Sequence, residues 1–200
     1  SMIEMLGVLA IIGVLSVGGI AGYSKAMTKY RINKVIEQVT LISTNIRTFF
    51  APQKAIDIYF DADFKIDDTY DQMIKKAKLV PDEMMEIVEG EPIIRSITHA
   101  FGGSVVLKGN KTEKKFVIRF HNIPEEACVD LLTQDWSNTY SKYISIEFST
   151  FYNFEAPVAV DLAVKACDKA YADPDNTYGV SLVWAVGYTR GADDLTTEIN

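Results

Sequence analysis

The residues that could carry out acid–base, nucleophilic or metal chemistry are few and widely separated. The chain has two histidines, His99 and His121, and neither stands at a metal-ligand spacing from a cysteine or from the other histidine. His121 follows an apparent strand and His99 precedes a Gly-Gly turn, so both are interpreted as structural or surface residues. The sequence contains no phosphate-cradling P-loop and no nucleophile-elbow motif. We therefore expect no enzymatic reaction, no catalytic residue, and no cofactor or metal.

Three further clusters could bind ligands but have simpler explanations. Phe101-Gly102-Gly103 could contact a phosphate, although a turn that leads into a strand is the commoner role of such a sequence. The run 173–176 (DPDN) offers several oxygens to a calcium ion, but it lacks the alternating ligands of a calcium loop, so a solvated turn is favoured. Lysines near a predicted hairpin indicate a solvated edge or, less often, an adhesive or subunit-contact patch. They are Lys108, Lys111, Lys114 and Lys115.

The two cysteines, Cys128 and Cys167, are the remaining reactive side chains. A bond between them would close a loop of about 40 residues, which chain-entropy arguments value at about 4 kcal/mol. Two buried free thiols are the commoner state in a reducing cytosol, whereas an oxidising compartment favours the disulfide. The state of the pair therefore depends on where the chain resides.

The first 25 residues differ sharply from the rest of the 200-residue chain. Glu4 and Lys25 are their only charges, so the whole net charge of −7 belongs to residues 26–200. The 20 uncharged residues 5–24 would rise about 30 Å as a helix, the thickness of a bilayer's hydrocarbon core. They lack the basic residues before them and the small-residue cleavage site after them that mark a secretory signal peptide. The sequence predicts a membrane-spanning stem, residues 1–25, joined to an acidic body, residues 26–200, whose charge disfavours nucleic-acid binding.

Beyond Lys25 the hydrophobicity becomes one-sided, because apolar residues recur at steps of three and four. This spacing is typical of an amphipathic helix that packs one stripe onto a domain. Ala51-Pro52 should end the helix, because the residue before a proline is pushed out of the helical region. We therefore predict one helix of about 50 residues, apolar all round in its first half. The recurring positions are Tyr30, Ile32, Val35, Ile36, Val39, Ile42, Ile46, Phe49 and Phe50.

Two features of the first half are unusual for a simple membrane anchor. Each of its glycines weakens a helix by roughly 1 kcal/mol relative to alanine. Close approach between helices would justify this cost, and the alternative is that glycine is simply common in membrane helices. Glu4 places a carboxylate beside the apolar run, which is unfavourable unless the charge has a partner or lies at the membrane interface. The glycines are Gly7, Gly13, Gly18, Gly19 and Gly22.

Residues 1–15 (SMIEMLGVLAIIGVL) resemble the processed amino terminus of type IV pilins. In that family a glutamate near the start is followed by about 20 apolar residues, and the long helix then runs into an α/β head. The family glutamate is the fifth residue of the mature chain, whereas here it is the fourth. In the head, residues 97–103 (ITHAFGG), 127–132 (ACVDLL) and 164–168 (VKACD) resemble the type IVb branch, which includes the bundle-forming and toxin-coregulated pilins.

The resemblance implies a structural protein, a major pilin that polymerises with identical subunits into an extracellular filament. The stem would hold the subunit in the inner membrane before assembly by a separate prepilin peptidase and pilus assembly machinery. Glu4 would neutralise the terminal amine of a neighbouring subunit in the filament core. Cys128 and Cys167 would form the disulfide of the branch's C-terminal region, which the oxidising compartment outside the inner membrane also favours. The alternatives are a minor pilin, a secretion-system pseudopilin, or a membrane-anchored periplasmic enzyme or binding protein.

We expect an α+β head in which an antiparallel sheet lies on the second half of the long helix. Residues 69–89 suit two short helices, with Pro81 at a first-turn position. The further expected elements, in chain order, are a hairpin of strands 104–108 and 115–121, a helix over 124–136, a strand over 143–148, a helix over 157–170 and a strand over 178–188.

Overall fold

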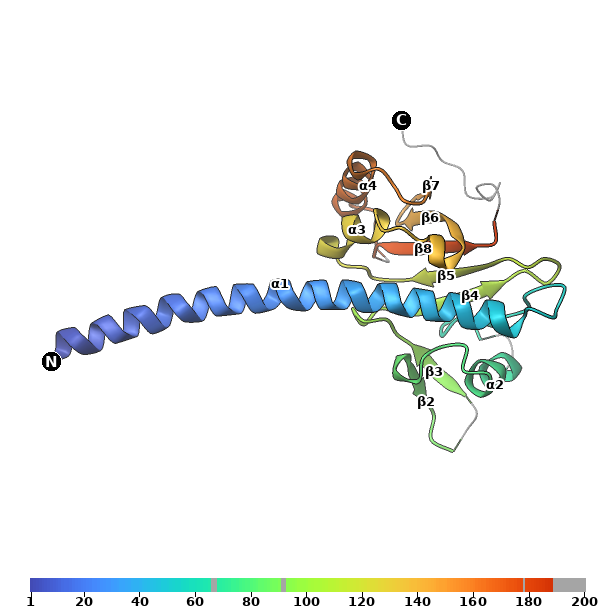
Figure 1. Ribbon diagram of the computed structural model, residues 1–200, viewed down its shortest axis with the longest axis horizontal. Coiled ribbons are helices and arrows are strands. Elements are labelled where there is room, and N and C mark those ends of the chain that lie inside the picture. The colour runs from blue at the N-terminus through green and yellow to red at the C-terminus, as the bar shows by residue number, and fades with distance from the viewer. Residues whose placement is uncertain (66–67, 91–92, 178, 189–200) are drawn as a thin grey trace.

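One long helix, α1 (Met2–Phe49), forms the axis of the molecule in the computed structural model, which describes residues 1–65, 68–90, 93–177 and 179–188 (Figure 1). Its first half projects away from the rest of the chain, and its second half lies across the head. The helix is 48 residues long and ends at Phe49, just before Ala51-Pro52. The predicted continuous helix and its end are confirmed.

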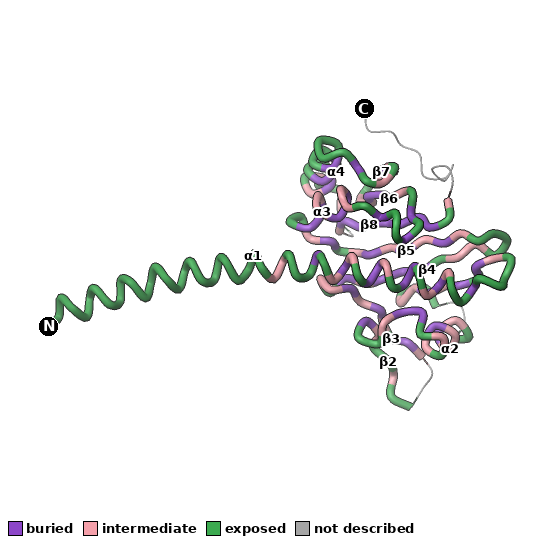
Figure 2. The backbone as a smooth tube through the Cα atoms, viewed as in Figure 1, coloured by how far each residue is buried: buried purple, intermediate pink, exposed green. Residues whose placement is uncertain are grey.

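Burial divides α1 into two parts (Figure 2). Residues 1–26 are all exposed, whereas the second half buries one side. The buried apolar positions are three or four residues apart, so they form a single stripe facing the core. They are Ile32, Val35, Val39, Ile42 and Ile46. The predicted change from an all-apolar helix to an amphipathic one therefore matches the burial of the second half.

The head is built on a six-stranded sheet in which every neighbouring pair of strands is antiparallel. Alternate residues on one face of this sheet meet α1, so that Leu107, Ile118 and Trp184 are fully buried. The ring of Trp184 lies edge-on to those of Phe120 and Trp136, with centroids 5.2 and 5.1 Å apart. In sheet order the strands are β1 (Tyr59–Phe60), β4 (Val105–Gly109), β5 (Phe116–Phe120), β8 (Ser181–Val186), β6 (Ser141–Glu147) and β7 (Phe151–Glu155).

Smaller elements flank α1 on its two sides (Figure 1). On one side α3 (Glu125–Leu132) and α4 (Val160–Ala172) pack together, and the 3-10 turn η2 (Ser137–Thr139) contacts α1. On the other side lie α2 (Asp68–Lys76), the 3-10 turn η1 (Asp82–Met84), and a two-stranded sheet of β2 (Met85–Ile87) and β3 (Ile94–Ile97). The expected α+β architecture, a long helix on an antiparallel sheet, is confirmed.

Several local predictions were wrong. The second helix expected within 69–89 is instead η1 followed by strand β2, because Pro81 and Gly90 leave room for a short hairpin in which β3 satisfies the backbone of β2. Gly90 adopts a φ of 83°, which suits glycine in the connecting turn. The described residues form eight strands rather than the expected four. The strands β1, β2, β3 and β7 were not predicted, because they are short or show little alternation of apolar and polar residues.

Helix and strand ends in the second half of the head also shift. The helix expected over 124–136 ends at Leu132, where the Thr133 hydroxyl donates to the Val129 carbonyl at 2.9 Å and stops the last turn. The helix expected over 157–170 begins at Val160 and ends at Ala172. The strand expected over 178–188 is β8, and its predicted first residue, Tyr178, lies outside the described residues.

Candidate functional site

The carboxylate singled out in the sequence, Glu4, lies in the first turn of α1. Its Oε2 atom is 2.7 Å from the amino nitrogen of Ser1, and the two residues are 81% and 63% exposed. A negative charge in the first helical turn interacts favourably with the helix dipole and with unpaired backbone N–H groups. In the isolated subunit the Glu4 charge therefore already has a partner, a positively charged amine within its own helix.

The stem presents apolar side chains on all sides. Its most apolar stretch has a mean hydropathy of 2.2 with none of its residues buried, and it is long enough to cross a membrane. The exposed apolar side chains are Met2, Ile3, Met5, Leu6, Val8, Leu9, Ile11, Ile12, Val14, Leu15, Val17, Ile20 and Tyr23. Apart from the backbone of the helix itself, no atom lies within 4 Å of where a Cβ would stand on any of the five stem glycines, so these positions leave space for a close neighbour.

Ion pairs fasten α1 to the head just beyond the stem. Lys29 Nζ lies 2.5 Å from Asp130 Oδ2 on α3, and Lys34 Nζ lies 2.8 Å from Glu83 Oε1 in η1. Hydrogen bonds to Glu83 and then Glu37 raise the pKa of Lys34 above its ordinary value. Sequence reasoning missed these contacts, although basic residues directly after an apolar run were visible. They link α1 to elements on both of its sides.

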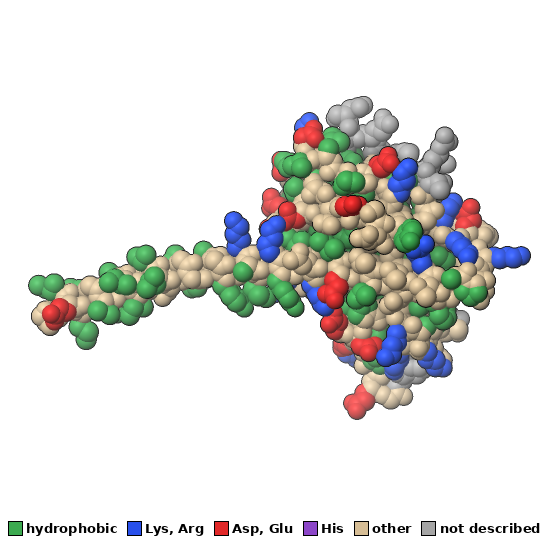
Figure 3. Space-filling view, in the orientation of Figure 1, with side chains coloured by type: hydrophobic (Ala, Val, Ile, Leu, Met, Phe, Trp, Pro, Cys, Tyr) green, Lys and Arg blue, Asp and Glu red, His purple; other side chains and the backbone are tan. Residues whose placement is uncertain are grey.

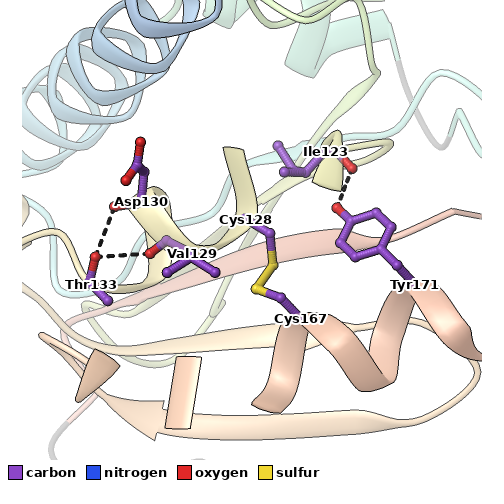
Figure 4. The surroundings of a disulfide bond; sticks show 7 residues. All are labelled: Ile123, Cys128, Val129, Asp130, Thr133, Cys167 and Tyr171. Atoms are coloured by element: carbon purple, nitrogen blue, oxygen red, sulfur yellow. Dashed lines mark hydrogen bonds between the residues drawn. A yellow bond between two sulfur atoms is a disulfide. The ribbon is translucent and has the colours of Figure 1, made fainter. Parts of the chain in front are cut away.

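The two cysteines meet, as the pilin resemblance implied. Cys128 on α3 and Cys167 on α4 form a disulfide with a Cα–Cα distance of 6.1 Å (Figure 4). Small buried alanines on both helices allow this close approach; they are Ala127, Ala163, Ala166 and Ala170. The crosslink joins α4 to α3, which in turn contacts α1.

A tyrosine supports the same pair of helices. The phenol of Tyr171 on α4 donates a hydrogen bond of 2.5 Å to the carbonyl of Ile123, just before α3 (Figure 4). Burial, together with the nearby Glu125 and Glu126, raises the pKa of Tyr171, so its hydroxyl keeps the proton that it donates. The C-terminal region is thus held to the head by a covalent bond and by a polar contact.

The histidines have structural contacts. His99 is buried, and its Nε2 atom lies 2.6 Å from the carbonyl oxygen of His121, while its Nδ1 accepts from the N–H of Phe101 at 3.2 Å. This pattern requires the neutral ring, and burial lowers the pKa of His99 accordingly. Position 103 requires glycine, because a Cβ there would stand 1.9 Å from the His121 carbonyl oxygen. The run 101–103 is therefore a turn packed against a histidine, in agreement with the sequence interpretation.

The candidate calcium run, 173–176, forms a turn whose first aspartate accepts hydrogen bonds from within the run and from Ser149. Asp173 accepts from the backbone N–H of Asp175 at 2.9 Å and from the hydroxyl of Ser149. These hydrogen bonds lower the pKa of Asp173, that from Ser149 most strongly. Within the part of the chain that the structure describes, no three His, Cys, Asp or Glu residues are grouped to hold a metal ion.

Comparisons with known proteins agree with this geometry. The family model described as PilS N terminal matches residues 19–183. A crystal structure of a type IV b pilin from Salmonella typhi has a similar fold, with a TM-score of 0.51 and 18% sequence identity over 76% of this chain and 97% of that chain. A search of curated proteins gives no match. Pilins are structural rather than catalytic proteins, so the expectation that this is not an enzyme is confirmed by its family. A long apolar helix on an antiparallel sheet, a disulfide-linked C-terminal region and the family match together show that the chain belongs to the PilS family of type IV pilins.

Proposed function

We propose that this chain is a major pilin, which polymerises with identical copies into an extracellular type IV pilus filament. The observation that carries this proposal is the complete exposure of the stem in the single subunit. Soluble monomers rarely leave apolar patches larger than a few hundred Å² uncovered, and a helix of this kind needs lipid or other apolar helices around it. The stem therefore requires an environment that one subunit alone does not supply.

Two environments would cover the stem in succession. Residues 1–25 would first span the inner membrane, with the head, residues 26–200, outside it, where oxidation of Cys128 and Cys167 is favoured. The stems of many copies would later pack together in the filament core, and the heads would form its surface. A separate prepilin peptidase and the pilus assembly machinery would carry out processing and polymerisation.

Glu4 would direct this transfer. Inside an apolar core an unpaired charge costs several kcal/mol, so an incoming subunit is favoured when its carboxylate meets a free terminal amine. In the subunit the partner of Glu4 is the amine of Ser1 in the same chain. Assembly would exchange this contact for one with the amine of a neighbouring copy.

Substitution of Glu4 tests the proposal. Glu4→Ala should leave a membrane-inserted subunit with an intact disulfide but should sharply reduce the filaments sheared from cells and seen by electron microscopy. Removing one partner of a buried ion pair costs about 3–5 kcal/mol, which is enough to prevent incorporation. Glu89→Ala, at an exposed head position, is the matched control and should assemble normally. A normal yield of filaments from Glu4→Ala would refute the role of this carboxylate.

The alternatives predict different material. A minor pilin would be a trace component of sheared filaments that consist mainly of another chain. A membrane-anchored enzyme or binding protein would be monomeric in detergent and absent from filaments. The disulfide-linked C-terminal region favours a pilin over a secretion-system pseudopilin.

A further inference from the structure

A cavity of about 420 Å³ opens on the face of the six-stranded sheet that is turned away from α1. Residues on this face alternate with the buried core residues of the same strands, and Val106, Arg119 and Ser181 line the cavity from β4, β5 and β8. The adjoining turn contacts α1 through the Ala100 N–H, which donates to Gln38 Oε1 at 3.1 Å. The opposite ends of β4 and β5 lie beside Ala51, where α1 ends, so the cavity is at the end of the sheet that is nearer to the stem.

The cavity carries two carboxylates that make no ion pair with any described residue of the same subunit. Arg119 Nε lies 2.8 Å from Glu147 Oε2, so these two charges cancel. His121 contacts Ser181, and its pKa is lowered first by burial and then by Arg119, so its ring is neutral at pH 7. Asp61 and Asp63 have no ion pair among the described residues.

These two aspartates are held in place by the chain itself. Asp61 Oδ1 accepts the backbone N–H of Asp63 at 3.0 Å in a tight turn at the end of β1. Both side chains line the cavity, and their charges act on the His121 ring. The result is a preformed recess of negative potential, which fits a positively charged group.

The opposite charge lies at the other end of the same two strands. We call residues 108–115, which comprise the end of β4 and the turn that joins it to β5, the basic turn; it contains Lys108, Lys111, Lys114 and Lys115. The Asn110 side chain fixes its shape by accepting the backbone N–H groups of Thr112 and Glu113, at 2.8 and 3.1 Å. Basic side chains gather at the end of the head farthest from the stem (Figure 3).

The four lysines of the basic turn differ in their contacts. Lys114 donates to the carbonyl of Ala51 at 2.7 Å, which places the turn beside the end of α1, and Lys115 pairs with Glu113 at 2.8 Å. Lys108 and Lys111 are exposed and make no ion pair among the described residues. Lys111, near the apex of the basic turn, lies beside the phenol of Tyr70, which donates to Asp57 Oδ1 at 2.7 Å.

The two patches are complementary but cannot meet within one subunit, because strands β4 and β5 separate them by roughly 17 Å. A patch that matches a different patch at the other end of the same molecule gives a head-to-tail contact, and such contacts generate open helical polymers. An antiparallel two-fold dimer would also pair unlike charges, but it would point the two stems in opposite directions. In the proposed filament all stems point the same way, so the charge pattern and the stem together select a second copy of this chain in an axial, head-to-tail arrangement.

We propose that the basic turn of one subunit docks at the acidic cavity of the next, with the ammonium group of Lys111 entering between the carboxylates of Asp61 and Asp63. This inference rests on the proposed function, since it concerns contacts between heads in the filament. Apolar stems supply attraction with little direction, whereas a charge contact between heads fixes which subunit lies beside which. The docking contact would set the axial register of the filament.

A charge exchange tests the docking contact. Asp63→Lys and Lys111→Glu should each lower the yield of sheared filaments roughly tenfold or more, because each places like charges together. The combined variant restores the attraction with reversed polarity and should recover most of the yield. Lys165→Glu, on the exposed side of α4, makes the same charge change away from both patches and should assemble normally. Wild-type yields from both single variants would overturn the proposal.

A crosslink between subunits decides the geometry independently of yield. Both native cysteines are already paired, so an added pair, Asp63→Cys with Lys111→Cys, should give a ladder of disulfide-linked oligomers from filaments on a non-reducing gel. The control pair, Asp63→Cys with Lys165→Cys, should give no ladder. Filaments from the first pair that run only as monomers would reject the docking contact while leaving the pilin function intact. Loss of filaments in Glu4→Ala tests that function separately.

Discussion

The two halves of α1 share one helical geometry but depend on different surroundings. From Ile32 to Ile46 the helix buries a stripe against a sheet that belongs to its own chain. In the stem no residue is buried, and the apolar surface continues all round the helix. The head half therefore has one defined set of partners, whereas the stem half can exchange lipid for other stems. One helix can therefore pack permanently on its own head through an apolar stripe and contact changing partners through a stem that is apolar on all sides.

The largest expected effect concerns the head, against which the second half of α1 is packed. Replacing Cys128 and Cys167 with serine should lower the free energy of unfolding of the head by about 4 kcal/mol, because the unfolded chain loses a closed loop. Stem helicity in detergent should not change. Thermal unfolding of the full subunit, followed by circular dichroism and tryptophan fluorescence, separates the two signals, since both tryptophans are buried in the head. An unchanged melting temperature would contradict the prediction.

A matched pair of isoleucines compares the two halves directly. Ile42→Ala should lower the free energy of unfolding by about 3 kcal/mol, because Ile42 is fully buried and the truncation leaves a cavity. Ile12→Ala should leave the detergent-solubilised subunit unchanged, because Ile12 is 53% exposed, and should act only on filament yield. Chemical denaturation of both variants and a count of sheared filaments provide the measurement. Equal loss of subunit stability in both would show that the stem also packs on the head.

The pH dependence should also be confined to the head. Burial lowers the folded-state pKa of both His99 and His121 below the value of about 6.5 that applies in the unfolded chain. The unfolded chain then binds more protons below pH 6.5, so head stability is complete above that pH and is lost as the pH falls toward the folded-state values.

Each histidine contributes at most about 1.4 kcal/mol per pH unit in that window. Denaturation at pH 7.5 and pH 5.5 measures the loss, and His99→Gln should make the profile flatter. A head that is equally stable at both pH values would show that these rings do not titrate on unfolding.

The smallest effect concerns the glycines of the stem, the part of α1 that can exchange lipid for other stems. In the filament we predict a melted or overextended segment between Gly13 and Ser24, as the pilin resemblance implies, because carbonyls in a protein core can find other partners. Gly18→Ala with Gly19→Ala should stabilise the helix by about 1 kcal/mol per site and oppose that extension. Apart from the backbone of the helix itself, no atom lies within 4 Å of either added methyl position, so the packing of the subunit should be unaffected. A filament structure with unbroken helical hydrogen bonding from Met5 to Phe49 would defeat this prediction.

The long helix could be predicted from the sequence almost to the residue, because length, charge and a three-to-four periodicity act locally. The β4–β5 hairpin, α4 and β8 could be located for the same reason. The strands β1, β2, β3 and β7 could not, because they are short and depend on neighbours that are distant in the sequence. Pro81 illustrates the ambiguity, since a proline that suits a first helical turn also suits the turn that leads into β2.

The candidate site was predicted unevenly for the same physical reason. Glu4 and the cysteines are rare residue types in distinctive positions, so sequence reasoning could select them. The acidic cavity combines the β1 end with residues of β5, β6 and β8, and no local pattern marks Asp61 or Asp63. The only sequence signal was the lysine cluster of the basic turn, which indicated a subunit-contact patch without indicating what it would meet.

The continuity of α1 has a mechanical consequence for a filament that is pulled. In the subunit α1 is one helix about 72 Å long, so tension on a head passes directly along the backbone of α1 toward the stem. The buried stripe from Ile32 to Ile46 runs parallel to that axis, so all of its contacts resist sliding together instead of opening one after another. The disulfide lies beside this line of force and keeps α4 attached to α3 while the helix is under strain. Under tension the head should therefore separate from α1 by slippage of the whole buried stripe at once.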